Sequence, residues 1–249
     1  MTVRTALIAL LVSAAVALAG CGGDDADPGA GTPTTSPKVS ATATDTTAPP
    51  TAADEEITAC LDTAPPAADD KPSFEKADQV VKADADYTIV MKTSCGTINI
   101  ALDQKAGGPI PNSIAFLAQK GFYDGLTFHR VVPDFVLQGG DPEGNGTGGP
   151  GYQVVGAVPE GYQYKLGDVA MAKTRTDPSG TAGSQFFVVS GPQGEQLLTS
   201  SPVYGILGRA QDRVSLATIA RIAALAVTDG PPSKPVWIIS ATLTEGLVA

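Results

Sequence analysis

The sequence predicts a mainly β domain, a closed antiparallel barrel capped by two helices, that begins after about Asp86. Three observations predict this fold class. Short segments in which apolar and polar residues alternate recur along the chain, glycine-rich turns separate them, and only two segments carry the apolar spacing of a helix. Many short strands with few helices favour a sheet that closes on itself, because closure removes unpaired strand edges.

The expected strands start with a hairpin, in which YTIVMK and GTINIAL flank the turn TSCG. Later strand candidates are LTFHRVV, FVLQ, GDVAMA, SQFFVVS, PVYGIL and VWIISATL. The expected helices cover residues 112–120 and about 212–224. Each helix spaces its apolar residues for one face, and Gly121 follows the first as a stop signal.

The segment FHRVVPDFVLQGGD, residues 128–141, is the most informative stretch of the chain. If its first residues form a strand, Phe128 and Arg130 share one face and His129 faces the other way. An arginine held among phenylalanines and glutamines, with no nucleophile nearby, is unsuited to acid–base or covalent chemistry. Such an arginine can bind a peptide group.

The chain has one histidine, and we expect His129 to be packed and hydrogen-bonded rather than to act as a base. A serine hydrolase would have to use it, yet the GxSxG motif is absent. Gln185 and Phe187 also share a face if SQFFVVS is a strand. They add an amide and an aromatic side chain to the predicted peptide site.

The first 20 residues predict a signal peptide. One charge, Arg4, precedes an apolar, alanine-rich stretch from Ala6 to Ala19 that is short for a membrane span. The stretch ends in LAGC, which resembles the bacterial lipobox. In a lipobox the cysteine becomes the lipidated amino terminus, so we expect Cys21 to carry two or three acyl chains, palmitate among them, which suffice for stable anchoring.

Residues 21–56 predict a disordered tether, because alanine, threonine, proline, glycine and aspartate offer little apolar surface to bury. A flexible coil of this length spans roughly 30 to 35 Å. The tether has a net charge of −6 and Arg4 of the signal peptide contributes +1, so residues 57–249 carry −5 of the total of −10. No basic surface for nucleic acid is expected. Residues 57–86 form a segment that precedes the domain.

Two cysteines remain if Cys21 is acylated. Outside the cytoplasm two such thiols are more often paired than free, and we hypothesise a disulfide between Cys60 and Cys95 that fastens the pre-domain segment to the first hairpin. The alternative is that both are unpaired, or that Cys95 is simply exposed in its turn. Neither has a histidine partner or CxxC spacing, which argues against zinc binding and redox catalysis.

Gly144, Gly146 and Gly149 formally match GxGxxG. A dinucleotide-binding loop follows a strand and opens a helix, whereas Pro150 and GYQVVG follow here. We therefore reject nucleotide binding. We expect a loop that uses glycine for positive φ and for close approach of the backbone.

The motifs from about Tyr87 to Leu243 together resemble a cyclophilin domain in their order and spacing. They are GFYDG, FHRVVPDFVLQGGD, GTGGPGY, AMAKT, GSQFF and VYG. The resemblance implies an eight-stranded barrel, residues 87–249, with a surface groove that binds Xaa-Pro peptides and speeds their cis–trans isomerisation. By position, the groove residues are Arg130, Phe135, Val136, Gln138, Gly146, Ala172, Lys173, Thr174, Gln185, Phe187 and Leu198.

Amide resonance sets the rotation barrier, roughly 18 to 20 kcal/mol, so a catalyst need only favour the twisted state. We expect Arg130 to donate toward the prolyl nitrogen, Gln138 to orient it and Gln185 to hold a carbonyl. Backbone groups of residues 172–174 would pair with an extended peptide. No bond is made or broken, so no metal or cofactor is expected. The proline ring would lie in an apolar pocket of Phe135, Val136, Phe187 and Leu198.

The segment EQLLTSSPVYG departs from the family pattern. Leu197 or Leu198 stands where many cyclophilins have a tryptophan, and Ser201 where a histidine or tyrosine often lines the groove. Lys173 stands where asparagine is frequent. Strong cyclosporin binding is therefore not expected.

The sequence thus predicts a monomeric peptidyl-prolyl isomerase that is anchored by lipid to the outer face of a bacterial membrane. Its partners would be proline-containing secreted or envelope polypeptides. The alternative is a membrane-tethered module that binds or holds proline segments with little turnover. The joint presence of Arg130, Phe135, Gln138 and Phe187 favours the enzyme, whereas the substituted edge at Leu197 to Ser201 favours the alternative.

Overall fold

The computed structural model describes residues 59–62 and 71–247. These residues all belong to one unit, Ala53–Ala249. The expected signal peptide, Cys21 and the tether lie outside the described residues. Within the described ranges, every helix is too short or too polar to cross a membrane.

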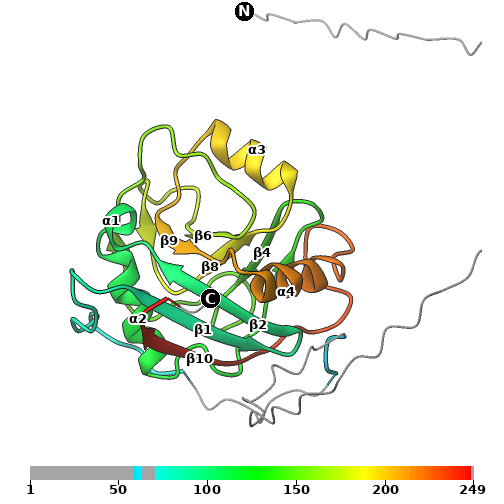
Figure 1. Cartoon of the computed structure of the whole chain (residues 1–249), viewed down its shortest axis with the longest axis horizontal. Helices are drawn as coiled ribbons and strands as arrows, with labels where there is room; N and C mark the ends of the chain where they lie inside the picture. Colours follow the sequence, from blue (N-terminus) through cyan, green and yellow to red (C-terminus); the bar gives the residue numbers. More distant parts are fainter. Residues whose placement is uncertain (1–58, 63–70, 248–249) are drawn as a thin grey trace, which may run out of the picture. The chain divides into compact units, whose positions relative to one another are not determined.

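Strands outnumber helices in the described part of the chain, as predicted (Figure 1). In chain order the elements are β1 (Tyr87–Thr93), β2 (Gly96–Leu102), α1 (Gln104–Gly107), α2 (Ile110–Gln119), β3 (Arg130–Val131), β4 (Val136–Gly139), β5 (Val154–Val155), β6 (Asp168–Met171), β7 (Thr181–Ala182), β8 (Phe186–Val189), α3 (Pro192–Ser200), β9 (Ile206–Arg209), α4 (Arg213–Ala223) and β10 (Ile238–Glu245). The helices α2 and α4 confirm the two that were predicted. The helices α1 and α3 were not predicted, so the described residues hold four helices rather than the two expected.

Eight strands form one antiparallel sheet in the order β10-β1-β2-β9-β6-β8-β4-β3, and β5 pairs with β7. The sheet is curled, since α4 contacts both β2 and β4, although three strands, β9, β6 and β8, lie between them in the sheet. Likewise α2 contacts both β10 and β9. Figure 1 shows α4 beside β2, and α2 beside β10.

The sheet does not close into a barrel by a continuous ladder, contrary to expectation. In the described part of the chain its outer strands meet through two isolated bridges, Thr127 with Trp237 and Val131 with Gly230. The segment that would extend β10 toward β3 contains Pro231, Pro232 and Pro235. Proline has no N–H to donate to a ladder. The result is a curled half-barrel rather than a closed one.

The central strands divide their side chains between two apolar clusters. Alternate residues of β4, β6 and β8 enter the main core, namely Leu137, Val169, Met171, Phe186 and Val188. The residues between them enter a second cluster, namely Val136, Ala170, Phe187 and Val189. Because side chains alternate across a strand, this second face is also the face of Gln138. It is the face on which the predicted site lies.

Phe128 and Arg130 do not share a face, contrary to the prediction. The strand β3 contains only Arg130 and Val131. Phe128 precedes it, is 1% exposed, and packs edge to face against Phe186 in the main core, with ring centroids 5.8 Å apart. Period-two alternation holds within a strand, and the chain here turns before the strand begins.

The disulfide between Cys60 and Cys95 is present, as hypothesised. Cys95 is fully buried, and Leu61 N–H donates to Ser94 O at 2.7 Å. A crosslink between residues 35 positions apart is expected to contribute about 4 kcal/mol by restricting the unfolded chain. Farther along, Phe74 packs edge to face on Phe116 of α2, with ring centroids 5.1 Å apart. The segment before β1 is therefore fastened to the domain.

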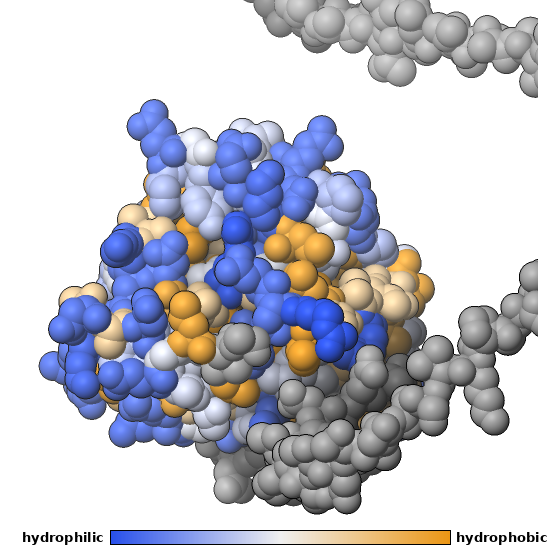
Figure 2. All heavy atoms as spheres, viewed as in Figure 1, coloured by the Kyte–Doolittle hydropathy of each residue, from blue (hydrophilic) through white to orange (hydrophobic). Residues whose placement is uncertain are grey.

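Hydrophilic side chains cover much of the described surface on the face shown in Figure 2, where apolar side chains lie in separate groups. The large apolar side chains that are exposed come from distant parts of the sequence: Leu61, Val155, Leu166, Leu197, Val227, Ile239 and Leu247. Of these, Leu197 belongs to the predicted edge of the groove.

Candidate active site

A row of hydrogen-bonded polar side chains crosses the second face of the sheet. Arg130 lies opposite Gln138 in the β3–β4 ladder, and its Nη1 donates to Gln138 Oε1 at 3.2 Å. Gln138 Nε2 donates to Gln185 Oε1 at 3.2 Å, and Gln185 Nε2 donates to Gly148 O at 2.9 Å. The row thus brings together three predicted residues and orients each amide by its neighbours.

Asp229 completes the row at its other end, and sequence reasoning missed it. Arg130 Nε donates to Asp229 Oδ1 at 2.5 Å, and Nη2 donates to Oδ2 at 2.9 Å. The hydrogen bonds from Arg130, and then its charge, lower the pKa of the Asp229 carboxyl. No local pattern marks Asp229, because 99 positions separate it from Arg130.

The predicted proline pocket is an apolar cluster beside this row. Val136, Phe187 and Leu198 are 3, 4 and 6% exposed and pack together, with Phe135 and Ala172 partly buried against them. We call these five residues the apolar pocket. Leu198, not Leu197, takes the inner position of α3, since Leu197 is 52% exposed. Leu198 is therefore the one of these two leucines that packs in the apolar pocket.

Tyr204 also belongs to this region, although sequence reasoning gave it no role. Its ring packs edge to face on Phe187, with centroids 5.1 Å apart. The motif VYG contained the signal, an aromatic residue just before β9. Tyr204 therefore backs the phenylalanine that is expected to contact the proline ring.

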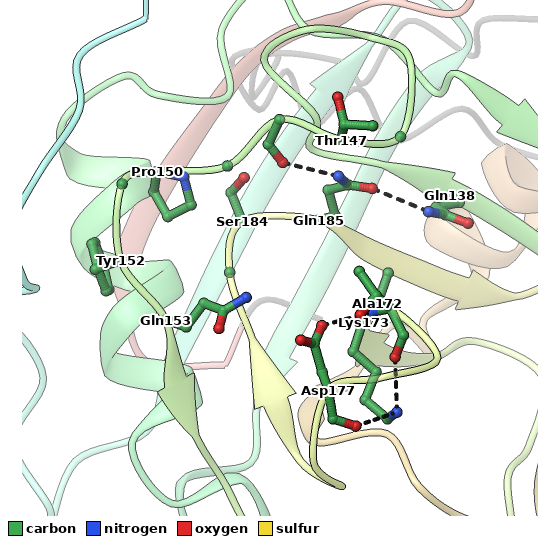
Figure 3. A pocket seen from close by; sticks show the side chains of 16 residues that line it. Gln138, Thr147, Pro150, Tyr152, Gln153, Ala172, Lys173, Asp177, Ser184 and Gln185 are labelled. Atoms are coloured by element: carbon green, nitrogen blue, oxygen red, sulfur yellow. Dashed lines mark hydrogen bonds between the residues drawn. The ribbon is translucent and has the colours of Figure 1, made fainter.

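A groove of about 650 Å³ opens next to the row (Figure 3). Six predicted site residues line it: Gln138, Gly146, Ala172, Lys173, Thr174 and Gln185. Figure 3 shows Gln138 and Gln185 between the glycine-rich loop and the loop that carries Lys173 and Asp177. The eleven predicted residues thus divide between the groove, the apolar pocket and Arg130, with the two glutamines in the groove wall nearest Arg130.

In the loop that follows β6, the polar groups form hydrogen bonds within the chain. Lys173 Nζ donates to the carbonyls of Thr174 and Asp177 at 3.1 and 3.0 Å and lies 6.0 Å from the centre of the Tyr204 ring. Ala172 N–H donates to Gln185 O at 2.9 Å, and Thr174 N–H to Asp177 Oδ2 at 2.8 Å. These two N–H groups, which were expected to pair with substrate, are bonded within the chain.

The glycine-rich wall, residues 144–151, is organised by one buried carboxylate. Asp141 is 1% exposed and accepts from the N–H groups of Glu143 and Asn145, each at 2.9 Å, and from that of Gly146. Gly146 has φ 94°, and a Cβ on Gly148 would collide with the Asp141 carboxylate. The prediction that glycine serves positive φ and close approach is confirmed.

The same wall is braced from outside by the segment before β1. Phe74 N–H donates to Pro150 O at 2.8 Å. Gly151 has φ 93°, and a Cβ there would collide with Ser73. The contacts of Ser73 and Phe74 therefore reach a groove-lining segment.

His129 is half-buried beside the row and is not placed as a base. Burial lowers its pKa, Arg130 lowers it further, and Asp141 opposes the change. Its Nδ1 is buried and has no hydrogen-bond partner in the described residues. The packed position was predicted correctly, whereas the expected hydrogen bond is missing at this nitrogen.

The chemistry available at this site is the binding and polarisation of a peptide group. A guanidinium held between a carboxylate and an amide offers directed N–H donors beside an apolar surface. In the described ranges, no three histidine, cysteine, aspartate or glutamate side chains gather as metal ligands would. Directed donors beside an apolar surface suit a reaction in which a peptide bond is twisted.

The fold and this site define a curled half-barrel that holds an arginine beside an apolar cluster. The family model described as cyclophilin type peptidyl-prolyl cis-trans isomerase/CLD matches residues 88–243, and the chain belongs to this family. The chain is thus a cyclophilin-type peptidyl-prolyl cis-trans isomerase, an activity of class EC 5.2.1.8, as its curated relatives' names also indicate.

Three such relatives show the extent of the likeness. A peptidyl-prolyl cis-trans isomerase of Synechococcus elongatus is 38% identical over 131 residues, which cover 52% of this chain and 84% of the relative. Peptidyl-prolyl cis-trans isomerase B of Bacillus subtilis is 54% identical over 79 residues, 31% of this chain and 52% of the relative. A probable isomerase B of Mycobacterium tuberculosis is 36% identical over 176 residues, 64% of this chain and 55% of the relative.

A solved structure shares the fold. It is a cyclophilin type isomerase of Cryptosporidium parvum in the presence of the dipeptide Ala-Pro, with a TM-score of 0.56 and 24% identity. The match covers 64% of this chain and 99% of that one. It bears out the mainly β cyclophilin-like fold.

Proposed function

We propose that this isomerase acts, as a monomer, on proline-containing polypeptides that fold outside the cytoplasm, and that acylated Cys21 anchors it to the outer face of the membrane. LAGC at the end of an apolar stretch supports the anchor. The bond between Cys60 and Cys95 supports the compartment, because disulfides persist where conditions are oxidising. Cys21→Ala should move the protein from the membrane fraction to the soluble fraction, and retention in the membrane would contradict the anchor.

We propose that the proline ring of the substrate packs on the apolar pocket while the preceding residue extends along the groove. The Ala-Pro dipeptide present with the Cryptosporidium relative supports this substrate class. Phe135 and the edges of Phe187 and Leu198 supply apolar contacts. Holding the ring still lets the acyl half of the bond rotate.

In this proposal Arg130 lowers the barrier by donating to the twisted prolyl peptide. In the twisted state the nitrogen lone pair leaves resonance and becomes a hydrogen-bond acceptor. A donor aimed at this nitrogen therefore binds the transition state more tightly than the planar ground state. Gln138 holds the guanidinium, and Gln185 holds Gln138.

The observation that carries the mechanism is the placement of Arg130 on the same face as the apolar pocket. The test is the isomerisation rate of a proline-containing tetrapeptide with the purified full-length chain and with Arg130→Ala. We expect kcat/KM to fall about 100-fold in the variant, the loss typical of a preorganised transition-state donor. Circular dichroism would verify folding. Turnover retained in Arg130→Ala would contradict this mechanism, and a folded wild type without turnover would favour the proline-binding module.

A further inference from the structure

The segment between α4 and β10 brings a carboxylate to the arginine of the site. Ser233 N–H donates to Leu225 O at 2.8 Å, which closes this segment on itself. Val131 N–H donates to Gly230 O at 2.8 Å, so Gly230 is bridged to the residue that follows Arg130. Backbone hydrogen bonds alone thus place Asp229 next to Arg130.

The side chains then meet in a fork. Both oxygens of Asp229 accept, one from Nε at 2.5 Å and one from Nη2 at 2.9 Å. A two-point contact between planar groups sets orientation as well as distance. The Asp229 side chain is 64% exposed, and exposed ion pairs stabilise folded proteins by only about 0 to 1 kcal/mol. The pair therefore does little for the fold.

The ion pair with Asp229 fixes the orientation of the Arg130 guanidinium. A guanidinium has five N–H donors. Asp229 takes two of them and Gln138 takes one. The other two have no hydrogen-bond partner in the described part of the chain. Because the carboxylate and the amide hold the group at two different places, the plane of the guanidinium cannot turn about the side-chain axis without breaking a bond.

We propose that Asp229 is a positioning residue of the isomerase reaction, which holds the guanidinium of Arg130 so that its two unengaged N–H donors are directed at the prolyl peptide. The proposal rests on the role given to Arg130 above. Asp229 acts through Arg130 and need not touch the substrate. Removal of the Asp229 carboxylate leaves the Arg130 guanidinium in place but free to rotate. Stabilisation of the transition state should then decrease, whereas substrate binding should change little.

The test compares Asp229→Ala, Asp229→Asn and a matched control in the full-length chain. Asp62 is the control, because it is also an exposed aspartate, 76% exposed, that pairs with a cation, Lys234, at 3.0 Å. We expect kcat to fall about tenfold in Asp229→Ala with KM little changed, as for the loss of a hydrogen bond to a charged group. Asp229→Asn retains one acceptor oxygen, so its kcat should lie between those of the wild type and Asp229→Ala. Asp62→Ala should turn over like the wild type.

A double variant separates this proposal from the one on which it rests. In the Arg130→Ala background, Asp229→Ala should cause no further loss of kcat. Unchanged or increased kcat in Asp229→Ala, beside a large loss in Arg130→Ala, would overturn the positioning role alone. Equal further losses in both backgrounds would overturn it as well. Wild-type turnover in Arg130→Ala would overturn both proposals together.

Discussion

The apolar pocket and the glycine-rich wall both adjoin the row of polar side chains that starts at Arg130, yet they are held in different ways. The pocket residues Val136 and Phe187 lie in strands paired on both sides and are almost fully buried. The wall has mostly exposed residues and depends on one buried carboxylate, Asp141, and on the contact of Phe74 with Pro150. Loss of a pocket residue should therefore damage fold and function together, whereas a change in the wall should mainly alter binding.

Phe187→Ala tests the pocket and should have the largest effect. Removal of a buried phenylalanine typically costs about 3 to 5 kcal/mol of unfolding free energy, because a cavity remains. Tyr204 would also lose its edge-to-face partner. Urea denaturation and the isomerase assay would measure the two losses. Leu197→Ala is the control, since that side chain is exposed on α3 and should change stability little. A loss below about 1 kcal/mol for Phe187→Ala would refute the account of the pocket.

Asp141→Ala tests the wall and should have an intermediate effect. Three backbone N–H groups lose their acceptor, and the expected loss of unfolding free energy is about 1 to 3 kcal/mol. The wall should then move, so we expect KM to rise more than kcat falls. Glu143→Ala, in the same loop but exposed, should stay within about 0.5 kcal/mol of the wild type. A pure kcat effect in Asp141→Ala would show that the wall acts on catalysis.

The pH dependence of stability should give the smallest effect. Burial lowers the pKa of His129 in the folded chain, so the unfolded chain binds the proton first as the pH falls. Stability should therefore be complete above about pH 6.5, the unfolded value, and decline as the pH drops from there to the lowered folded value. Denaturation midpoints at several pH values would show this. The decline should vanish in His129→Gln, because the chain has one histidine. An unchanged decline in this variant would assign it to other groups.

Local patterns predicted most elements of the fold, whereas the site residues were predicted by position from the resemblance to cyclophilins. Alternation and turns predicted β1, β2, β4, β6, β8, β9 and β10, and apolar spacing predicted α2 and α4. The helix α3 was missed, because PQGEQLLTS buries only Gly194 and Leu198 and so shows almost no apolar period. The face of Phe128 was wrong because the strand starts two residues later than assumed.

The sequence by itself determined the class of protein. It also predicted the pairing of Cys60 with Cys95, and the arginine, glutamines and apolar residues of the site. Each of these follows from residue types close together in the chain or from motifs in a particular order. Only the tertiary structure decided that the barrel stays open at its proline-rich seam. Only the tertiary structure brought Asp229 to Arg130. Their contact spans 99 positions and depends on how the sheet curls, so local sequence periodicity cannot predict it.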